Sequence, residues 1–238
     1  MKYRATVRFS IIFAFLVCLA VSICPQAVET FQVNFTRTVK ENKGEYITRG
    51  TLYYKAPDKV FIHVTTPVGQ WSVFDARETT IYYPDSRKAF IFKNSGGNVI
   101  PFTQSFLGLV KDDFGLSDAG FKILGQDWRG GNLFTFWKPP NGFEKSFGRV
   151  TLGVEENKPF FLEAVDTRNN LIFRIVYSGF KAVGGGVFPS RVHLIQREQG
   201  KEISEEIDYG DFKAGENLPA AVEHFSLPPD VILKEMTW

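Results

Sequence analysis

The sequence is poor in the residues that bind metals and form disulfides. It has two cysteines and three histidines among 238 residues. Both cysteines, Cys18 and Cys24, lie near the N-terminus, so the rest of the chain must depend on an apolar core. His63, His193 and His224 are far apart and lack the short spacing to other ligands that metal sites show. The sequence therefore predicts no metal and no cofactor.

Sequence motifs for catalysis are missing as well. There is no Gly-x-Ser-x-Gly elbow and no phosphate-binding loop. Three glycines at 184–186 are followed by a predicted strand rather than a helix, which favours a turn. The acidic pairs at 112–113 and 155–156 are more typical of a solvated surface than of acid–base chemistry. We therefore expect a protein that is not an enzyme.

Residues 1–27 have the pattern of a secretory signal. Lys2, Arg4 and Arg8 precede an apolar run at 9–23, which is short for a membrane span, and residues 25–27 end the run. The sequence predicts export and a single domain over residues 28–238. Removal of the leader lowers the formal net charge from +2 to −1. That balance gives no indication of a nucleic-acid surface.

Two alternatives for the N-terminus stay open. Cleavage after Ala27 would place Pro25 three residues before the cut, so a retained membrane anchor is the first alternative. Lipidation of Cys24 is the second, and it is disfavoured because the large Ile23 directly precedes the cysteine.

The rest of the chain is rich in phenylalanine and reads as successive strands. Of 24 phenylalanines, three lie in the leader. Such a content indicates an aromatic β core or, alternatively, a cavity with an aromatic wall. Alternation and turn residues predict strands at 31–39, 46–55, 60–66, 71–74, 80–83, 89–93, 122–124, 133–137, 148–154, 159–166, 171–177, 187–196 and 202–208. Adjacent antiparallel strands of this kind predict a meander that curls into a barrel or half barrel.

The strand at 60–66 raises a specific question about its two faces. Val60, Ile62 and Val64 fall on one face, and Phe61 and His63 fall on the other. The second face is thus partly apolar. The strand either belongs to a core with two sides or lines a space for an apolar ligand.

Residues 101–110 interrupt the strands with a helical pattern. Pro101 suits a first helical position, and Phe102, Phe106, Leu109 and Val110 form one apolar stripe. The segment is interpreted either as a lid over the open side of the sheet or as a permanently packed plug.

Several segments together resemble the LolA-like family of periplasmic outer-membrane lipoprotein carriers. The resemblance is closest over residues 31–110. It rests on the order of segments 35–39 (FTRTV), 50–58 (GTLYYKAPD), the strand with His63 and Pro67, 75–83, 100–102 (IPF) and 225–229 (FSLPP). No single motif is highly specific.

The resemblance implies a mainly β fold, a half-open antiparallel β-barrel with short helices as a lid over an apolar cavity. It also implies a carrier that holds the acyl chains of lipoproteins, or lipid, and moves them through the periplasm toward the outer membrane. Carried over by position, the cavity residues are Leu52, Tyr54, Val60, Ile62 and Val64 from the sheet, with Phe102, Phe106 and Leu109 from the lid.

The same resemblance implies the partners: acylated lipoproteins or phospholipid, an inner-membrane release transporter and an outer-membrane acceptor, with the carrier as a monomer. One departure concerns Ala56, where the family has an arginine that tethers the lid. Lid control must therefore differ here, or the cavity stands open. A membrane-anchored acceptor or a lipid-sensing regulator of the same fold is the alternative function, and a purely structural envelope domain is a further one.

Overall fold

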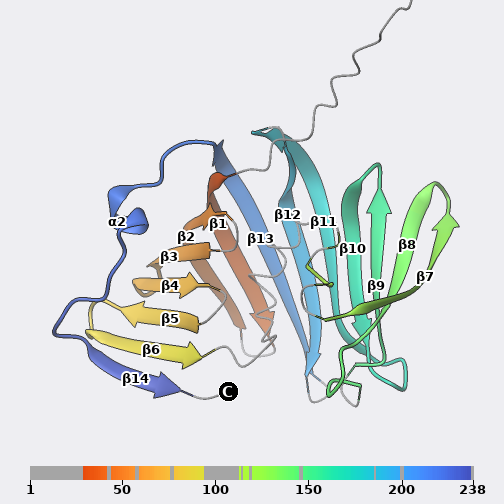
Figure 1. Cartoon of the computed structure of the whole chain (residues 1–238), viewed down its shortest axis with the longest axis horizontal. Coiled ribbons are helices and arrows are strands. Elements are labelled where there is room, and N and C mark those ends of the chain that lie inside the picture. The colour runs from red at the N-terminus through yellow and green to blue at the C-terminus, as the bar shows by residue number, and fades with distance from the viewer. Residues whose placement is uncertain are drawn as a thin grey trace, which may run out of the picture.

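The structure is a computed structural model, and it describes residues 29–41, 44–56, 59–75, 78–93, 113, 115–117, 120–144, 147–184, 186–198 and 201–236. Figure 1 shows one large sheet that bends between two limbs. The N-terminal limb consists of β1 (Thr30–Glu41), β2 (Gly44–Lys55), β3 (Lys59–Thr66), β4 (Gln70–Phe74), β5 (Glu78–Tyr83) and β6 (Lys88–Lys93). The C-terminal limb consists of β7 (Lys122–Arg129), β8 (Asn132–Lys138), β9 (Arg149–Glu155), β10 (Lys158–Val165), β11 (Leu171–Val183), β12 (Gly186–Glu198) and β13 (Lys201–Ala214).

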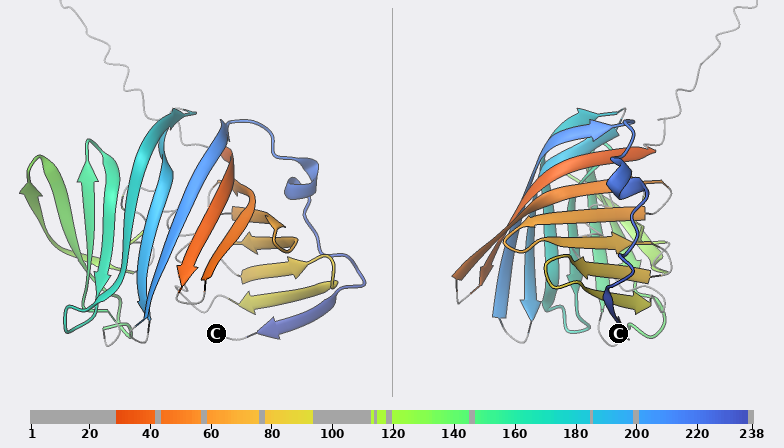
Figure 2. Two further views of the ribbon diagram at one scale, coloured as in Figure 1. Left: turned by 180° about the vertical axis from the view of Figure 1, so that it is seen from behind. Right: turned by 90° about the vertical axis from the view of Figure 1, so that its left-hand side faces the viewer.

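The 14 strands that the structure describes form one open sheet in the order β14-β6-β5-β4-β3-β2-β1-β13-β12-β11-β10-β9-β8-β7. Each limb is an antiparallel meander, and the pairing of β1 with β13 joins the two limbs. The last strand, β14 (Ile232–Met236), runs parallel to β6. Figure 2 shows that β1 and β2 run alongside β13, whereas the later strands of the N-terminal limb lie across this direction, so the sheet is strongly bent.

The prediction of a mainly β fold is confirmed. Each of the predicted strand ranges overlaps one of β1 to β13. The sequence analysis predicted neither β14 nor the short helix α2 (Ala220–Glu223). The predicted lid helix at 101–110 and the predicted signal at 1–27 lie outside the described residues.

One face of the sheet carries most of the core, and we call it the inner face. Strand register places Phe31, Val33 and Phe35 of β1 on this face, and they continue across neighbouring strands in one cluster. Phe31 stacks on Phe188 of β12 with ring centroids 4.6 Å apart. Because residues of β1–β3 and of β8–β13 pack in the same cluster, the inner face is the inside of the bend.

The opposite, outer face of β2–β4 is covered by the C-terminal segment. Phe61 and Val73 pack there against Leu218 and the α2 residue Val222. Lys55 and Glu223 form an ion pair of 2.8 Å that also holds the segment. The strand at 60–66 therefore contributes to a core on both faces, which answers the question raised by its sequence.

Candidate functional site

The structure places the predicted sheet residues of the cavity on the inner face. Leu52 and Val60 are fully buried, Tyr54 and Ile62 are 5% exposed, and Val64 is partly buried against the same cluster. The predicted lid residues Phe102, Phe106 and Leu109 lie outside the described residues.

Antiparallel register explains why these five side chains meet. Tyr54 lies opposite Val60, Leu52 opposite Ile62, and Gly50 opposite Val64. Directly opposed residues point to the same side of a sheet, so alternation on β2 and β3 produces one apolar surface. Gly50 has no side chain for a steric reason, since a Cβ there would lie 2.3 Å from the carbonyl oxygen of His63.

The apolar surface extends far beyond the predicted residues. On the C-terminal limb it includes Trp137, Val150, Leu152, Leu162, Ala164, Ile175, Tyr177, Phe188, Val192, Leu194, Ile207 and Tyr209. Alternation within the predicted strands could have found many of them. The sequence does not reveal which face of each strand joins the others, because the register between limbs is a tertiary property.

The centre of the inner face, with Leu52 and Ile62, is closed to solvent, whereas Val64 and other residues around it are only partly buried. Its buried members are at most 8% exposed. An acyl chain therefore cannot reach the surface formed by Leu52 and Ile62 unless the molecule opens. Opening exposes apolar area to water, and the free energy of this exposure must be offset by the chain that is bound.

Polar groups on the inner face are few. Burial raises the pKa of Tyr177, and the neighbouring Tyr209 raises it further, so its hydroxyl stays protonated. Glu205, which is 5% exposed, forms a two-point ion pair with Arg37. Sequence reasoning missed this pair, because nothing in either segment indicates that the two residues meet.

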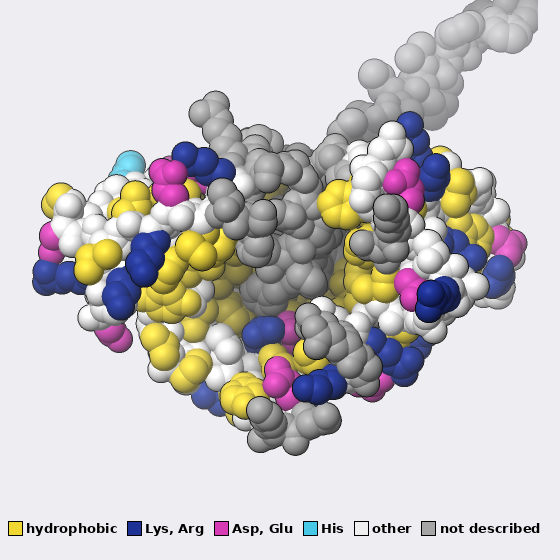
Figure 3. Space-filling view, turned by 90° about the horizontal axis from the view of Figure 1, so that it is seen from below, with side chains coloured by type: hydrophobic (Ala, Val, Ile, Leu, Met, Phe, Trp, Pro, Cys, Tyr) yellow, Lys and Arg dark blue, Asp and Glu magenta, His cyan; other side chains and the backbone are white. Residues whose placement is uncertain are grey.

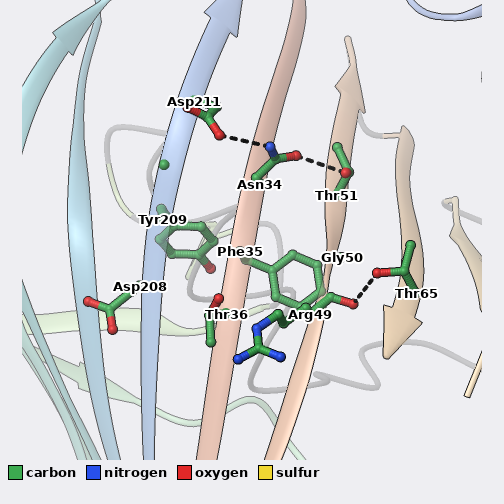
Figure 4. Close-up of a pocket in the computed structure, with 11 residues that line it drawn as sticks. Asn34, Phe35, Thr36, Arg49, Gly50, Thr51, Thr65, Asp208, Tyr209 and Asp211 are labelled. Carbon is green, nitrogen blue, oxygen red and sulfur yellow. Dashed lines mark hydrogen bonds between the residues drawn. The ribbon is translucent and has the colours of Figure 1, made fainter. Parts of the chain in front are cut away.

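An open pocket lies elsewhere, where β13, β1 and β2 run side by side (Figure 4). It has a volume of about 550 Å³. Asn34 donates a hydrogen bond to Asp211 at 3.0 Å and accepts one from Thr51 at 2.9 Å. The side chains that line this open pocket are mainly polar, so it is not the apolar cavity that the sequence predicts.

His63 lies on the outer face, away from the apolar cluster of the inner face. Its ring stacks on Trp71 with centroids 4.0 Å apart, and Trp71 also contacts Phe225. Burial lowers the pKa of His63.

The described residues contain no group of three or more histidine, cysteine or acidic side chains that could hold a metal ion. Among these same residues, no helix has the length and apolar character needed to cross a membrane.

Comparisons with solved structures show the same fold in three bacterial proteins. A DUF1329 family protein from Desulfovibrio piger is 14% identical, with a TM-score of 0.61 over 86% of this chain and 93% of the other. A LolA superfamily protein from Nitrosomonas europaea is 17% identical, with a TM-score of 0.57 over 82% and 89%. A putative outer membrane lipoprotein-sorting protein domain from Vibrio parahaemolyticus is 10% identical, with a TM-score of 0.58 and the same coverage.

No curated protein sequence matches this chain. The family model of the outer membrane lipoprotein carrier protein LolA matches residues 26–176, which is more than half of the chain. The predicted resemblance is thereby confirmed, and the chain belongs to the LolA family.

Proposed function

We propose that this protein is a periplasmic carrier that binds the acyl chains of lipoproteins, or of lipid, on the inner face of its sheet. The observation that supports the proposal is the continuous apolar surface across both limbs of one open, bent sheet. Family membership is consistent with it. The carrier delivers its cargo toward the outer membrane, performs no catalysis and acts as a monomer.

The energetics fit a carrier with a large apolar wall. Each methylene that leaves water contributes about 0.8 kcal/mol. A ligand with several acyl chains therefore contributes a favourable free energy that offsets the exposure of apolar area when the inner face opens. In this proposal Leu52, Tyr54, Val60, Ile62 and Val64 form the wall in the sheet. Phe102, Phe106 and Leu109 form the part contributed by the lid.

A comparison of two identical substitutions on opposite faces tests the binding wall. Val64 is on the inner face, and Val176 lies on the outer face because its neighbours Ile175 and Tyr177 point inward. We expect Val64→Glu to weaken uptake of an acylated lipoprotein at least about tenfold, because a buried carboxylate opposes an apolar ligand. Val176→Glu should bind normally. Normal uptake by folded Val64→Glu would contradict the proposed wall.

Native mass spectrometry of protein purified from its own envelope fraction without detergent tests the proposal most directly. Bound acylated protein or phospholipid supports a carrier. A mass without ligand, and no uptake of added lipoprotein, counts against it. The intact mass also shows whether residues 1–27 are retained, which would favour the membrane-anchored acceptor.

Release and delivery require two partners in this proposal. An inner-membrane release transporter loads the carrier, and an outer-membrane acceptor receives the cargo. Membership of the family supports both partners in this proposal. Transfer of radiolabelled lipoprotein from inner-membrane vesicles to this protein, and from it to outer-membrane vesicles, tests the two steps separately.

A further inference from the structure

Three basic side chains form a row across the outer face of β7, β8 and β9. Lys122 of β7 lies directly opposite Lys138 of β8. The register of β8 with β9 places Trp137 opposite Val150, so Lys138 and Arg149 come next to each other across the same two strands. Trp137 and Val150 belong to the inner cluster, and the residues beside them in the strands therefore point outward. All three side chains of this basic row are exposed.

The basic row opposes the stability of the sheet. Like charges directly opposite each other on neighbouring strands are destabilising. Within the described part of the chain, no ion pair joins the row to an acidic side chain. Asp127 and Glu163, which point to the same outer face, are paired with Arg129 and Arg174. Packing of the sheet thus gives no reason for the row, and an anionic partner accounts for it better.

One acidic group lies within electrostatic reach of the row. The backbone N–H of Gly142 donates to the exposed carboxylate of Glu144 and lowers its pKa, and the charge of Lys138 lowers this pKa further. A single carboxylate compensates one charge at most. The basic row therefore keeps a net positive charge.

Four phenylalanines form an aromatic strip beside the basic row on the same outer face. Phe134 and Phe136 come from β8, Phe160 and Phe161 come from β10, and all four are partly exposed. Phe134 packs edge-on against Phe160 with ring centroids 5.7 Å apart. Both rings lie over Gly153 of β9, where a Cβ would be 2.8 Å from Phe160. Phe136 joins the strip to the row, since the Cζ of the arginine in the row lies 5.7 Å from the centroid of this ring.

The aromatic strip and the basic row are not covered by another described element. All described strands belong to one sheet, and α2 packs on the outer face of β2–β4. Figures 1 and 2 show α2 and β14 beside the N-terminal limb, away from β7–β10. In Figure 3 the C-terminal limb lies on the right, where Lys, Arg and hydrophobic side chains lie next to one another with acidic ones among them.

We propose that the outer face of β7–β10 docks the protein on an anionic lipid surface. The aromatic strip enters the boundary between headgroups and acyl chains, and the basic row lies at the level of the lipid phosphates. Such binding grows with the buried apolar area and with each basic side chain near the surface. Lysine and arginine suit this place because their stems can lie along apolar groups while the charge reaches the headgroups.

The charge pattern favours a lipid surface over a protein partner. Three like charges on one row need several anions side by side, and phosphates of neighbouring lipids supply them in every direction. The docking face and the inner face lie on opposite sides of the sheet. The inference therefore goes beyond the proposed function and does not depend on it, and a lipid bound on the inner face cannot shield Lys122 or Lys138.

Chemical footprinting of lysines tests the docking face in the wild-type protein. Protein purified from its own envelope fraction is mixed with vesicles of phosphatidylcholine and phosphatidylglycerol in equal parts, or of phosphatidylcholine alone. Lysines are acetylated with sulfo-N-hydroxysuccinimide acetate, and peptide mass spectrometry gives the rate at each position. With the anionic vesicles, Lys122 and Lys138 should react at least about tenfold more slowly. The exposed Lys40 and Lys234 of the other limb should react at an unchanged rate.

The variant Lys122→Gln/Lys138→Gln/Arg149→Gln removes the basic row. It relieves the opposition of like charges, so we expect it to fold. The ratio of its binding to anionic and to neutral vesicles, measured by flotation, should fall by at least about tenfold. This ratio cancels any binding through an apolar N-terminus, which does not depend on lipid charge.

A matched control removes two lysines and one arginine from exposed positions outside the docking face. It is Lys40→Gln/Arg49→Gln/Lys234→Gln, and it should keep the ratio of the wild type. Unprotected Lys122 and Lys138, or an unchanged ratio in the folded variant without the row, overturns the inference. Protection by a detergent extract of the envelope but not by vesicles also overturns it and assigns the face to a protein partner. None of these results bears on the carrier function, because uptake on the inner face is measured separately.

Discussion

At the scale of single residues, the ion pair with Arg37 holds the carboxylate of Glu205 in the core. Arg37→Met removes both hydrogen bonds and leaves a buried charge. We expect the free energy of unfolding to fall by about 3–5 kcal/mol, as is typical when one member of a buried pair is lost. Unfolding in urea, followed by circular dichroism, measures it.

The double variant Arg37→Met/Glu205→Leu is the control for this prediction. It removes both charges, so most of the lost stability should return. A double variant that is as unstable as Arg37→Met would show that packing of the arginine side chain, rather than charge pairing, stabilises this region.

His63 gives a second prediction at the residue scale, on the dependence of stability on pH. Burial beside Trp71 lowers its pKa in the folded state. The pKa of a histidine in an unfolded chain is about 6.5. Below this pH the imidazole of His63 binds a proton more strongly in the unfolded chain than in the folded protein. Stability should therefore decrease as the pH falls from 6.5 toward the lower folded pKa, and this contribution is absent above pH 6.5.

Replacement of His63 by phenylalanine keeps a ring that can stack on Trp71 and removes the titration. The slope of unfolding free energy against pH between 5 and 7 should become flatter than in the wild type. Equal slopes in the two proteins would show that His63 is solvated as well in the folded state as in the unfolded chain. Carboxylates with lowered pKa values, such as Asp113 and Asp166, act at lower pH.

At the scale of elements, the C-terminal segment depends on a few apolar contacts with the outer face. Leu218 is 7% exposed and packs with Phe61 and Val73. Leu218→Ala should lower the free energy of unfolding by about 2–5 kcal/mol, the usual range for loss of a buried leucine side chain. Met236→Ala, at an exposed position of β14, should change it by less than about 0.5 kcal/mol. Thermal unfolding of both variants provides the comparison.

The strands were predictable because alternation and turn residues are local signals. The helix α2 was not, since its four residues from Ala220 to Glu223 are too few to show a helical period. The strand β14 was missed for another reason. Its five residues are all exposed, so its extended form depends on pairing with β6, and no alternation of buried residues marks it.

The family resemblance predicted only the part of the candidate site that lies on β2 and β3. The five sheet residues from Leu52 to Val64 share a face, as alternation on adjacent strands requires, but their role in binding stays a proposal. The residues of β8–β13 and the pair of Arg37 with Glu205 depend on the contact of β1 with β13. Arg37 and Glu205 are 168 positions apart, and no local pattern specifies such a contact.

At the scale of the whole molecule, the two limbs share one core although each is a separate meander. The inner cluster contains Leu52 and Ile62 from one limb and Leu152 and Ile175 from the other. A limb that unfolded alone would expose the apolar side of its neighbour to water. We therefore expect denaturant unfolding to be a single cooperative transition for both limbs.

Two variants with one tryptophan each can report the limbs separately. Trp71 belongs to β4 of the N-terminal limb, and Trp137 belongs to β8 of the C-terminal limb. With all other tryptophans replaced by phenylalanine, the fluorescence midpoint of each variant should coincide with the midpoint that circular dichroism gives for the same variant. An acylated lipopeptide at about 100 times its Kd should raise stability by about 2.7 kcal/mol at both positions, since it binds only the folded state. A rise confined to the Trp71 variant would show that the limbs unfold separately, and it would contradict both the single transition and a binding surface that spans the bend.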